Sequence, residues 1–240
     1  MPLRRYGAPG TGQQEKSAEL PVIGRLDPLA TIRGVSDDSS VMSTGRLEAF
    51  SDGVFAIAIT LLVLEIRLPE GWEEDPGGAL IGLWPSYLAY MVTFLLVGMI
   101  WMNHHRMFHF IRRTDGPLLA LNVLLLMDVA FLPFPTHVLA ETLHADHGTQ
   151  TAAVFYGIVL VIGGIFYNAV WWYASSGHRH LGGHITPAEA RSLRFRWGMG
   201  PVLYLVATVI GAFSAIGALV FYVLLLFFYM FDMRPRRQAA

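Results

Sequence analysis

The run from Gly45 to Leu68 is long and apolar enough to cross a lipid bilayer as a single helix. A bilayer core of roughly 30 Å requires about 20 apolar residues in a helix. Between Gly53 and Leu64 only Thr60 has a polar side chain, and the ionisable side chains lie towards the two ends of the run. An acid at the start of such a helix needs a partner, because charge in hydrocarbon is expensive and usually functional. The run therefore predicts a membrane-spanning helix that does more than anchor the chain.

The composition of the whole chain agrees with this prediction. Of the 240 residues, 54% are hydrophobic and 15% are charged, whereas soluble domains carry about 25% charged residues. The chain has no cysteine, which excludes disulfides and thiolate metal sites. We therefore predict an all-α integral membrane protein.

The two ends of the chain differ from the rest. Residues 1–42 are rich in glycine, proline, serine and charge, and they contain no apolar segment of the kind found in cleavable signal peptides. We predict that they form a disordered cytoplasmic tail. Residues 233–240 form a short basic C-terminus, which we also place in the cytoplasm. The membrane domain then comprises residues 43–232.

Six apolar segments of this domain are predicted to span the membrane. They cover residues 45–68, 79–103, 116–139, 151–175, 197–213 and 216–232. Pro133 and Pro135 should end or kink the third span. The last two spans share one apolar run that is too long for one span, and we divide it near Ser214–Gly217. Before the fifth span, Thr186 is expected to cap the start of a helix, with Pro187 at its first position.

The distribution of basic residues predicts the orientation of the chain. With the N-terminus in the cytoplasm, the inner segments are 1–46, 104–115, 176–197 and 233–240, and they hold all but one of the 17 lysines and arginines. Only Arg67 falls on the outer side. This partition predicts an even number of spans, both termini in the cytoplasm and a multi-pass protein of the plasma membrane.

One face of the first span carries branched aliphatic side chains at helical spacing. At about 100° per residue, Ile57, Leu61, Leu64 and Leu68 fall on one stripe, with Thr60 beside it. Periodicity alone favours a packing face. The alternative is a pore wall, because rings of isoleucine and leucine in a symmetric oligomer can form a narrow hydrophobic constriction.

Polar residues gather at the cytoplasmic ends of the first and second spans. The cluster comprises Arg46, Ser51, Asp52, Trp101, Asn103, His104 and His105. We predict a hydrogen-bonded network in which Asp52 accepts from Arg46 and from histidine or tryptophan N–H groups. One alternative is that these side chains only reach towards the membrane interface. A zinc site is disfavoured, because adjacent histidines point in different directions on a helix.

Three motifs resemble those of the transmembrane protein 175 family of potassium channels. The R-x-x-x-F-S-D-G motif at residues 46–53, followed by an Ile/Leu/Thr helix, resembles the family signature. The W-x-x-H-H-R stretch at 101–106 and P-x-P-T at 133–136 support it. The resemblance extends through all six spans. Animal members carry two six-helix repeats and this chain carries one, so it is similar to prokaryotic members and a homotetramer is implied.

The resemblance implies a passive channel that prefers K⁺ to Na⁺. The first helix of each of four subunits would line a central pore, with the constriction at Ile57, Leu61 and Leu64 and with Thr60 facing a passing cation. The chain lacks the TVGYG filter of ordinary potassium channels, in agreement with the family. We expect no cofactor apart from permeant K⁺. The expected partners are further copies of the chain, the lipid bilayer and K⁺, without nucleic acid.

Two other functions compete with a channel. A proton-coupled or proton-permeable secondary transporter would use Asp128 and the histidines, but the chain shows neither inverted repeats nor a pair of broken helices. An enzyme is disfavoured, because there is no serine nucleophile motif and no HExxH. For Asp128, in the middle of the third span, we favour a structural bond to Asn168 or Tyr167 over a proton relay.

Overall fold

The helices of this chain begin and end at positions that reflect both apolarity and local capping. A computed structural model describes residues 44–145, 147–178, 180–183 and 185–232. The predicted tail, residues 1–42, and the basic C-terminus, 233–240, lie outside the described residues. All described residues belong to one compact unit, which is built from helices and contains one isolated β-bridge, between Ile111 and Leu181.

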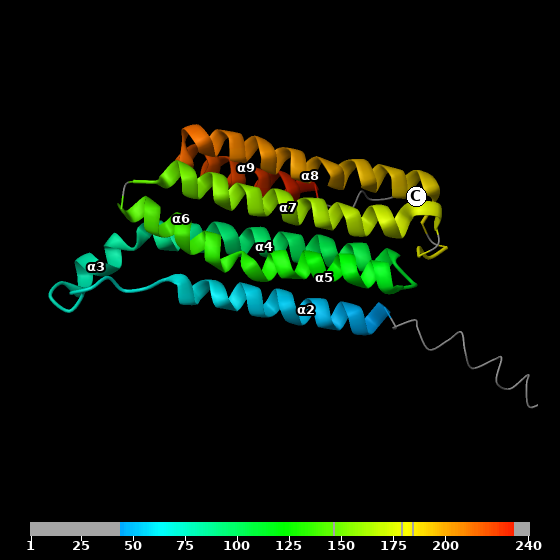
Figure 1. Cartoon of the computed structure of the whole chain (residues 1–240), viewed down its shortest axis with the longest axis horizontal. Helices are drawn as coiled ribbons and strands as arrows, with labels where there is room; N and C mark the ends of the chain where they lie inside the picture. Colours follow the sequence, from blue (N-terminus) through cyan, green and yellow to red (C-terminus); the bar gives the residue numbers. More distant parts are fainter. Residues whose placement is uncertain (1–43, 146, 179, 184, 233–240) are drawn as a thin grey trace, which may run out of the picture. The chain divides into compact units, whose positions relative to one another are not determined.

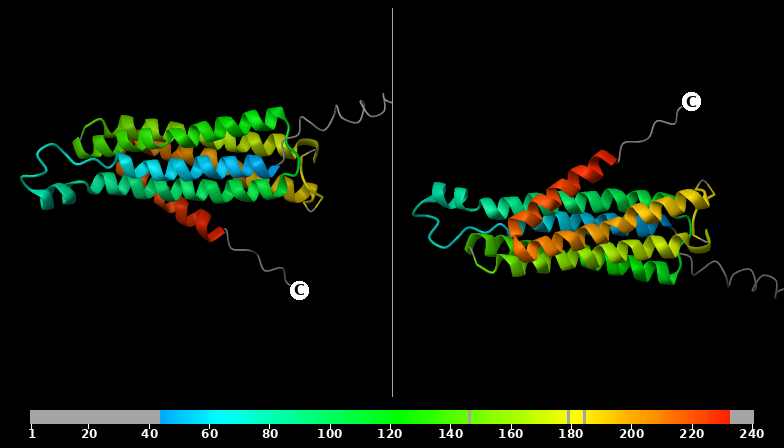
Figure 2. Two further views of the ribbon diagram at one scale, coloured as in Figure 1. Left: turned by 90° about the horizontal axis from the view of Figure 1, so that it is seen from below. Right: turned by 90° about the horizontal axis from the view of Figure 1, so that it is seen from above.

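The helices are α2 (Thr44–Leu61), α3 (Pro76–Gly82), α4 (Trp84–Phe110), α5 (Gly116–Phe131), α6 (Pro133–Ala145), α7 (Thr149–Ser175), α8 (Pro187–Phe213) and α9 (Ala215–Asp232), with 3-10 turns η1 (Leu62–Glu65) and η2 (Ser176–His178). Most of them lie alongside one another, and the short helix α3 lies beyond the end of this bundle (Figure 1). Helix α2 packs against α4 and α5, and α7 packs against α8. Figure 2 shows α9 crossing the other helices obliquely.

Five helical segments are long and apolar enough to cross a membrane. They are Thr44–Glu65, Trp84–Phe110, Gly116–Ala145, Thr149–Ser175 and Pro187–Phe213. The sixth predicted span corresponds to α9, whose shorter apolar part is Ala215–Phe227. The helical, membrane-type fold is therefore the one that the sequence predicts.

Two helices extend beyond the spans that apolarity marks. Helix α4 begins at Trp84, after the separate helix α3, and continues past the predicted end at residue 103 to Phe110. Helix α8 begins at Pro187, well before the predicted span at residue 197. An apolar segment marks only the part of a helix that lies within the hydrocarbon of the bilayer. The helix itself continues into water until its backbone is capped or broken.

Local signals set the other boundaries. Thr186 forms a capping box with Glu189, whose carboxylate accepts from the Thr186 backbone N–H at 2.8 Å, which confirms the predicted start of α8. In the third span, α5 ends at Phe131 and α6 begins at Pro133, so the predicted break is also confirmed. A proline lacks the backbone N–H that would continue the helix.

Small residues allow α7 and α8 to approach closely, as is typical of helix contacts in membranes. A Cβ added at Gly164 would lie 3.0 Å from Cγ and 3.4 Å from Cα of Pro201. About two turns further along α7, Trp171 packs edge to face on Trp197 of α8, with ring centroids 4.8 Å apart. This aromatic pair and the glycine contact fix the spacing of the two helices.

Replacing Gly164 by alanine is expected to destabilise the fold by about 1–3 kcal/mol, because α8 must shift to accommodate the methyl group. The measurement is thermal unfolding of the purified protein in detergent. Gly98 on α4 is the control, since an added Cβ there meets nothing within 4 Å. Gly98→Ala should leave stability unchanged or slightly raised. Equal unfolding midpoints for the two variants would contradict the close contact.

Candidate functional site

Helix α2 has one face packed on the bundle and one face open. The packed face consists of Leu47, Ser51, Phe55, Ala58 and, in η1, Leu62, all of which are buried. The open face, here called the exposed stripe, comprises Phe50, Gly53, Ile57, Thr60, Leu61 and Leu64. The exposed fractions of Ile57, Leu61 and Leu64 are 61%, 40% and 64%. The aliphatic stripe predicted from the sequence therefore faces away from its own chain.

Thr60 lies in this stripe with its hydroxyl turned towards the helix. Its Oγ1 donates to the carbonyl oxygen of Ile57 at 2.9 Å. The hydroxyl hydrogen is thus occupied, and the oxygen's lone pairs are its remaining hydrogen-bonding capacity. This oxygen can accept a hydrogen bond from water or coordinate a cation, because the hydroxyl hydrogen points towards the helix backbone and not towards the open face.

Behind the stripe, a buried hydrogen-bond chain connects α2, α4 and α5. His104 Nε2 lies 2.9 Å from Asn122 Oδ1, and Asn122 Nδ2 donates to Ser51 Oγ at 3.0 Å. Ser51 Oγ in turn donates to the Leu47 carbonyl oxygen at 2.8 Å. An amide oxygen only accepts, so His104 carries its proton on Nε2. Each bond therefore has one direction, from the histidine to the backbone of α2.

The three side chains that form this series of hydrogen bonds are fully buried, and His104 is held between aromatic rings. His104, Asn122 and Ser51 each have an exposed fraction of 0%. The His104 ring stacks on Phe108 at 4.5 Å and is tilted against Phe55 at 5.3 Å. A buried polar atom is costly to leave unpaired, so each of these hydrogen bonds favours the arrangement that forms it. The chain therefore fixes both the position and the rotation of α2 against the bundle.

Two further polar contacts lie nearer the surface. The Trp101 indole donates to Asp52 Oδ1 at 2.8 Å, and Asp52 is the acceptor that the sequence predicts. His105 Nδ1 lies 2.9 Å from Glu48 Oε1 rather than on Asp52. Both contacts connect α2 with α4, which the predicted network also does.

Other members of the predicted cluster lie apart from it. Arg46 is exposed, and within the described residues it makes no hydrogen bond or ion pair. Asn103 lies on a different face of α4 and lines a cavity together with Asp128 of α5. Asp128 does not bond to Asn168 or Tyr167 as expected. The Asn168 amide nitrogen donates instead to the carbonyl oxygens of Gly164 and Trp197, so its N–H groups are not available to the Asp128 carboxylate.

Sequence reasoning missed a second buried chain of hydroxyls. Tyr156 Oη lies 2.9 Å from Thr93 Oγ1, which lies 3.0 Å from Thr136 Oγ1. Thr136 donates to the Leu132 carbonyl oxygen at 2.8 Å, so the other hydroxyls donate towards it in turn. This chain connects α7, α4 and α6. The signal that could have predicted this contact is that each of the three residues carries a hydroxyl group within a largely apolar span.

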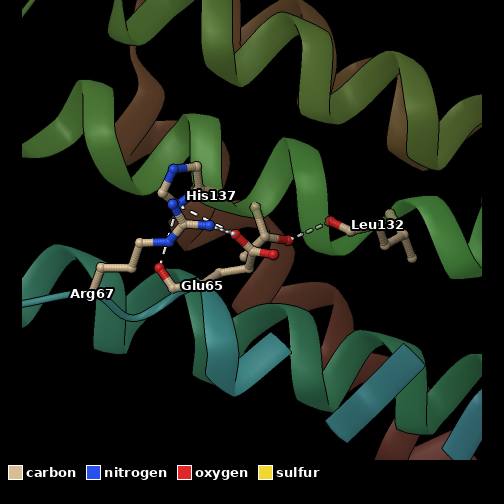
Figure 3. A network of polar contacts seen from close by, with 5 residues as sticks. Glu65, Arg67, Leu132 and His137 are labelled. Carbon is tan, nitrogen blue, oxygen red and sulfur yellow. Dashed lines mark hydrogen bonds and ion pairs between the residues drawn. The ribbon is translucent and has the colours of Figure 1, made fainter. Parts of the chain in front are cut away.

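At the opposite end of α2, the 3-10 turn η1 is held by α6. Figure 3 shows His137 and Arg67 meeting at Glu65. His137 Nδ1 lies 3.3 Å from the Glu65 carbonyl oxygen and 3.5 Å from its carboxylate, and Arg67 lies 4.0 Å from the same carboxylate. Leu64, the last residue of the exposed stripe, therefore lies within an anchored turn.

The described residues offer no metal site of the usual kind. Within residues 44–145, 147–178, 180–183 and 185–232, no three His, Cys, Asp or Glu side chains gather where they could hold a metal ion. The zinc alternative at His104 and His105 gains no support from this arrangement. The chemistry of the site is therefore that of hydrogen bonds, packing and an exposed aliphatic stripe.

Comparisons with known proteins place these features in a family. The family model described as "Endosomal/lysosomal potassium channel TMEM175" matches residues 46–133, which include most of α2, all of α4 and α5, and Pro133 at the break. A protein of Streptomyces collinus named as a potassium channel is 41% identical over 202 residues, covering 82% of this chain and 97% of the relative. A potassium channel of Chamaesiphon minutus is 46% identical over 167 residues, covering 68% and 82%.

A solved structure has a similar fold. It is the crystal structure of a lysosomal potassium-selective channel TMEM175 homolog from Chamaesiphon minutus. The two structures superpose with a TM-score of 0.70 at 38% sequence identity, and the match covers 79% of this chain and 97% of the other. The similarity thus includes nearly all of that channel.

Proposed function

This chain belongs to the TMEM175 family of potassium channels, and we propose on that basis that it conducts K⁺ passively across a membrane through a pore lined by α2. The observation that carries the pore is the exposed stripe. Ile57 on α2 is 61% exposed and Leu64 in the following turn η1 is 64% exposed, whereas the opposite face of α2 and η1 is buried. Aliphatic side chains that avoid their own bundle are available to line a space between subunits.

The pore requires several copies of the chain. One helix presents one stripe, and one stripe does not enclose a path for an ion. We propose a homotetramer, as the family resemblance implies, in which Ile57, Leu61 and Leu64 each form a ring of four. The partners are then further copies of the chain, the lipid bilayer and K⁺. We propose no cofactor and no catalytic activity, since the named relatives are ion channels.

The orientation in the membrane follows from charge. We propose that α9 forms a sixth span and that both termini lie in the cytoplasm of a plasma-membrane protein. The support is the position of the basic residues, of which all but Arg67 fall in the inner segments. In this orientation His104 and Trp101 lie at the inner end of the pore helix, and the Glu65–His137 contact lies at the outer end.

Selectivity in such a pore depends on water. A hydrophobic ring does not replace the hydration shell of an ion, so a passing cation loses part of its water without compensation. K⁺ holds its water less tightly than Na⁺, so the cost of entering the ring is smaller for K⁺. Thr60 adds a partial compensation, because its oxygen lone pairs remain available after its hydrogen bonds to Ile57.

The transporter alternative finds less support. Asp128 lies in a cavity whose lining, among the described residues, includes none from α2. Of the histidines, His104 is engaged by Asn122 and His137 by Glu65, so they do not gather around Asp128. A coupled transporter needs its coupling groups at one site.

The experiment is reconstitution of the full chain into planar bilayers with K⁺ on one side and Na⁺ on the other. We expect discrete unitary currents that reverse towards the K⁺ equilibrium potential at equal pH on both sides. Slow flux without unitary steps, dependent on a proton gradient and abolished by Asp128→Asn, would instead establish the transporter. A protein that passes K⁺ and Na⁺ equally would contradict the selectivity proposed here.

A further inference from the structure

A cavity of about 60 Å³ lies between α4, α5, α7, α8 and α9, away from the exposed stripe. Its lining includes the polar side chains of Asn103, Asp128 and Asn168 and the tyrosines Tyr167, Tyr204 and Tyr229. The rest of the lining is aliphatic, aromatic or glycine and proline, and among the described residues it includes no lysine and no arginine. The cavity therefore combines an acid with an apolar wall, and it is separate from the proposed pore.

The acid in this cavity has no partner from its own chain. Asp128 is buried, and its Oδ2 lies so close to the backbone of α7 that a Cβ added at Gly163 would overlap it. In the part of the chain that the structure describes, the Asp128 carboxylate accepts no hydrogen bond and forms no ion pair. A carboxylate at this depth is costly unless it is paired. Its arrangement leaves room for a donor that comes from outside the chain.

The Asn168 amide oxygen and the Tyr167 hydroxyl, which also line the cavity, favour a ligand that donates hydrogen bonds. Both hydrogens of the Asn168 amide are used, on the carbonyl oxygens of Gly164 at 2.8 Å and Trp197 at 3.1 Å. Its Oδ1 remains as an acceptor. The Tyr167 hydroxyl is buried without a hydrogen-bond partner among the described residues. The cavity thus offers a carboxylate, an amide oxygen and a hydroxyl to a ligand that carries several N–H or O–H groups.

The rest of the lining favours an organic cation over a metal ion. Tyr167, Trp197, Tyr204 and Tyr229 line the cavity, and aromatic rings attract ammonium groups. A bare alkali cation needs a shell of oxygen atoms in place of its water, which this mostly apolar wall does not supply. A cavity needs about 10–15 Å³ to hold one water molecule. A cavity of about 60 Å³ therefore holds an ammonium group with a short alkyl part.

We propose that this cavity binds a small primary or secondary organic ammonium ion. The ligand's N–H groups donate to Asp128 and to Asn168 Oδ1, and its alkyl part packs on the apolar wall. Because the site joins residues of α4, α5, α7, α8 and α9, an occupied cavity holds these helices together. The proposal does not depend on the pore, since binding is measured without conduction.

The first test compares a cation with its neutral analogue on the full chain purified in detergent. Thermal unfolding is followed while butylammonium chloride or 1-butanol is added at constant ionic strength. We expect butylammonium to raise the unfolding midpoint in a saturable way, because a ligand that binds only the folded state stabilises it by mass action. Butanol should not. An equal, saturable rise with butanol would overturn the proposal, because it would show that charge is irrelevant.

The second test uses variants. Asp128→Asn should weaken butylammonium binding roughly ten- to a hundredfold, the range expected for loss of a charge-assisted hydrogen bond. Tyr167→Phe removes only the unpartnered hydroxyl and should weaken binding by a smaller factor, about two- to tenfold. Glu141→Gln makes the same kind of charge change at an exposed position of α6 and should leave binding unchanged.

Each outcome decides for or against the site. If Asp128→Asn does not fold, Tyr167→Phe compared with Glu141→Gln carries the test, because loss of a hydroxyl without a partner removes no bond within the protein. Unchanged butylammonium binding in both Asp128→Asn and Tyr167→Phe would overturn the proposal. So would stabilisation by K⁺ that disappears in Asp128→Asn, since it would assign the cavity to an alkali cation.

Discussion

Replacing Ile57 by serine is expected to raise the unitary conductance by about tenfold or more and to reduce the preference for K⁺ over Na⁺. In the proposed tetramer, four hydroxyl groups would replace a ring of aliphatic side chains, so water would fill the constriction. A barrier lower by about 1.4 kcal/mol corresponds to a tenfold faster passage. Both ions would then keep more of their water, and the difference between them would shrink. The measurement is single-channel recording with K⁺ and Na⁺ on opposite sides.

Ile59→Ser provides the matched control. Ile59 is the same residue type on the same helix, but it is half-buried and packs against the core instead of lying in the exposed stripe. Its substitution should leave the conductance and the permeability ratio of each open channel unchanged. If Ile57→Ser leaves the K⁺/Na⁺ permeability ratio at its original value, the hydrophobic ring is not the origin of selectivity.

Replacing Asn122 by leucine is expected to cost about 1–3 kcal/mol of folding free energy. The substitution removes the middle of the chain from His104 to Ser51, and it leaves the His104 Nε2–H buried without an acceptor. An unsatisfied buried donor costs about this much. The same change should loosen α2 from α4 and α5, because this chain is their buried polar contact. Thermal unfolding in detergent measures the first effect.

Asn103→Leu is the control for this substitution. Asn103 precedes His104 directly, but it lines the cavity beside Asp128 and takes no part in the buried chain. We expect its unfolding midpoint to stay close to that of the original protein. If the Asn122→Leu protein is as stable as the Asn103→Leu protein, the buried hydrogen bonds from His104 to Ser51 contribute little to holding α2 against α4 and α5.

The positions of the helices could be predicted from the sequence because apolarity and capping act locally. Pro133 ends a helix by its missing N–H, and Thr186 caps one with its hydroxyl, whatever surrounds them. The C-terminal end of α4 and the N-terminal start of α8 could not be predicted from apolarity. Both helices continue into regions where charged side chains are solvated, and there hydropathy no longer distinguishes helix from loop.

The contacts between polar residues were harder to predict than their presence. Asn103 and His104 are neighbours in sequence, but about 100° separates them around the helix. One therefore faces the Asp128 cavity and the other faces Asn122. The position of Asn122 depends on how α5 is rotated against α4, which is a property of tertiary packing. The presence of an amide side chain in a largely apolar span was the signal that could have identified Asn122.

The most direct test of the central claim is the reaction of single cysteines in η1, the turn that continues α2 at its outer end, with a charged thiol reagent. The chain has no native cysteine, so Leu64→Cys and Leu62→Cys each carry one thiol. Leu64 is 64% exposed in the stripe, whereas Leu62 is 1% exposed on the packed face. Reagent added from the outer side should reduce the K⁺ current of Leu64→Cys channels and leave that of Leu62→Cys channels unchanged. Block of Leu62→Cys with no effect on Leu64→Cys would contradict a pore lined by the exposed stripe.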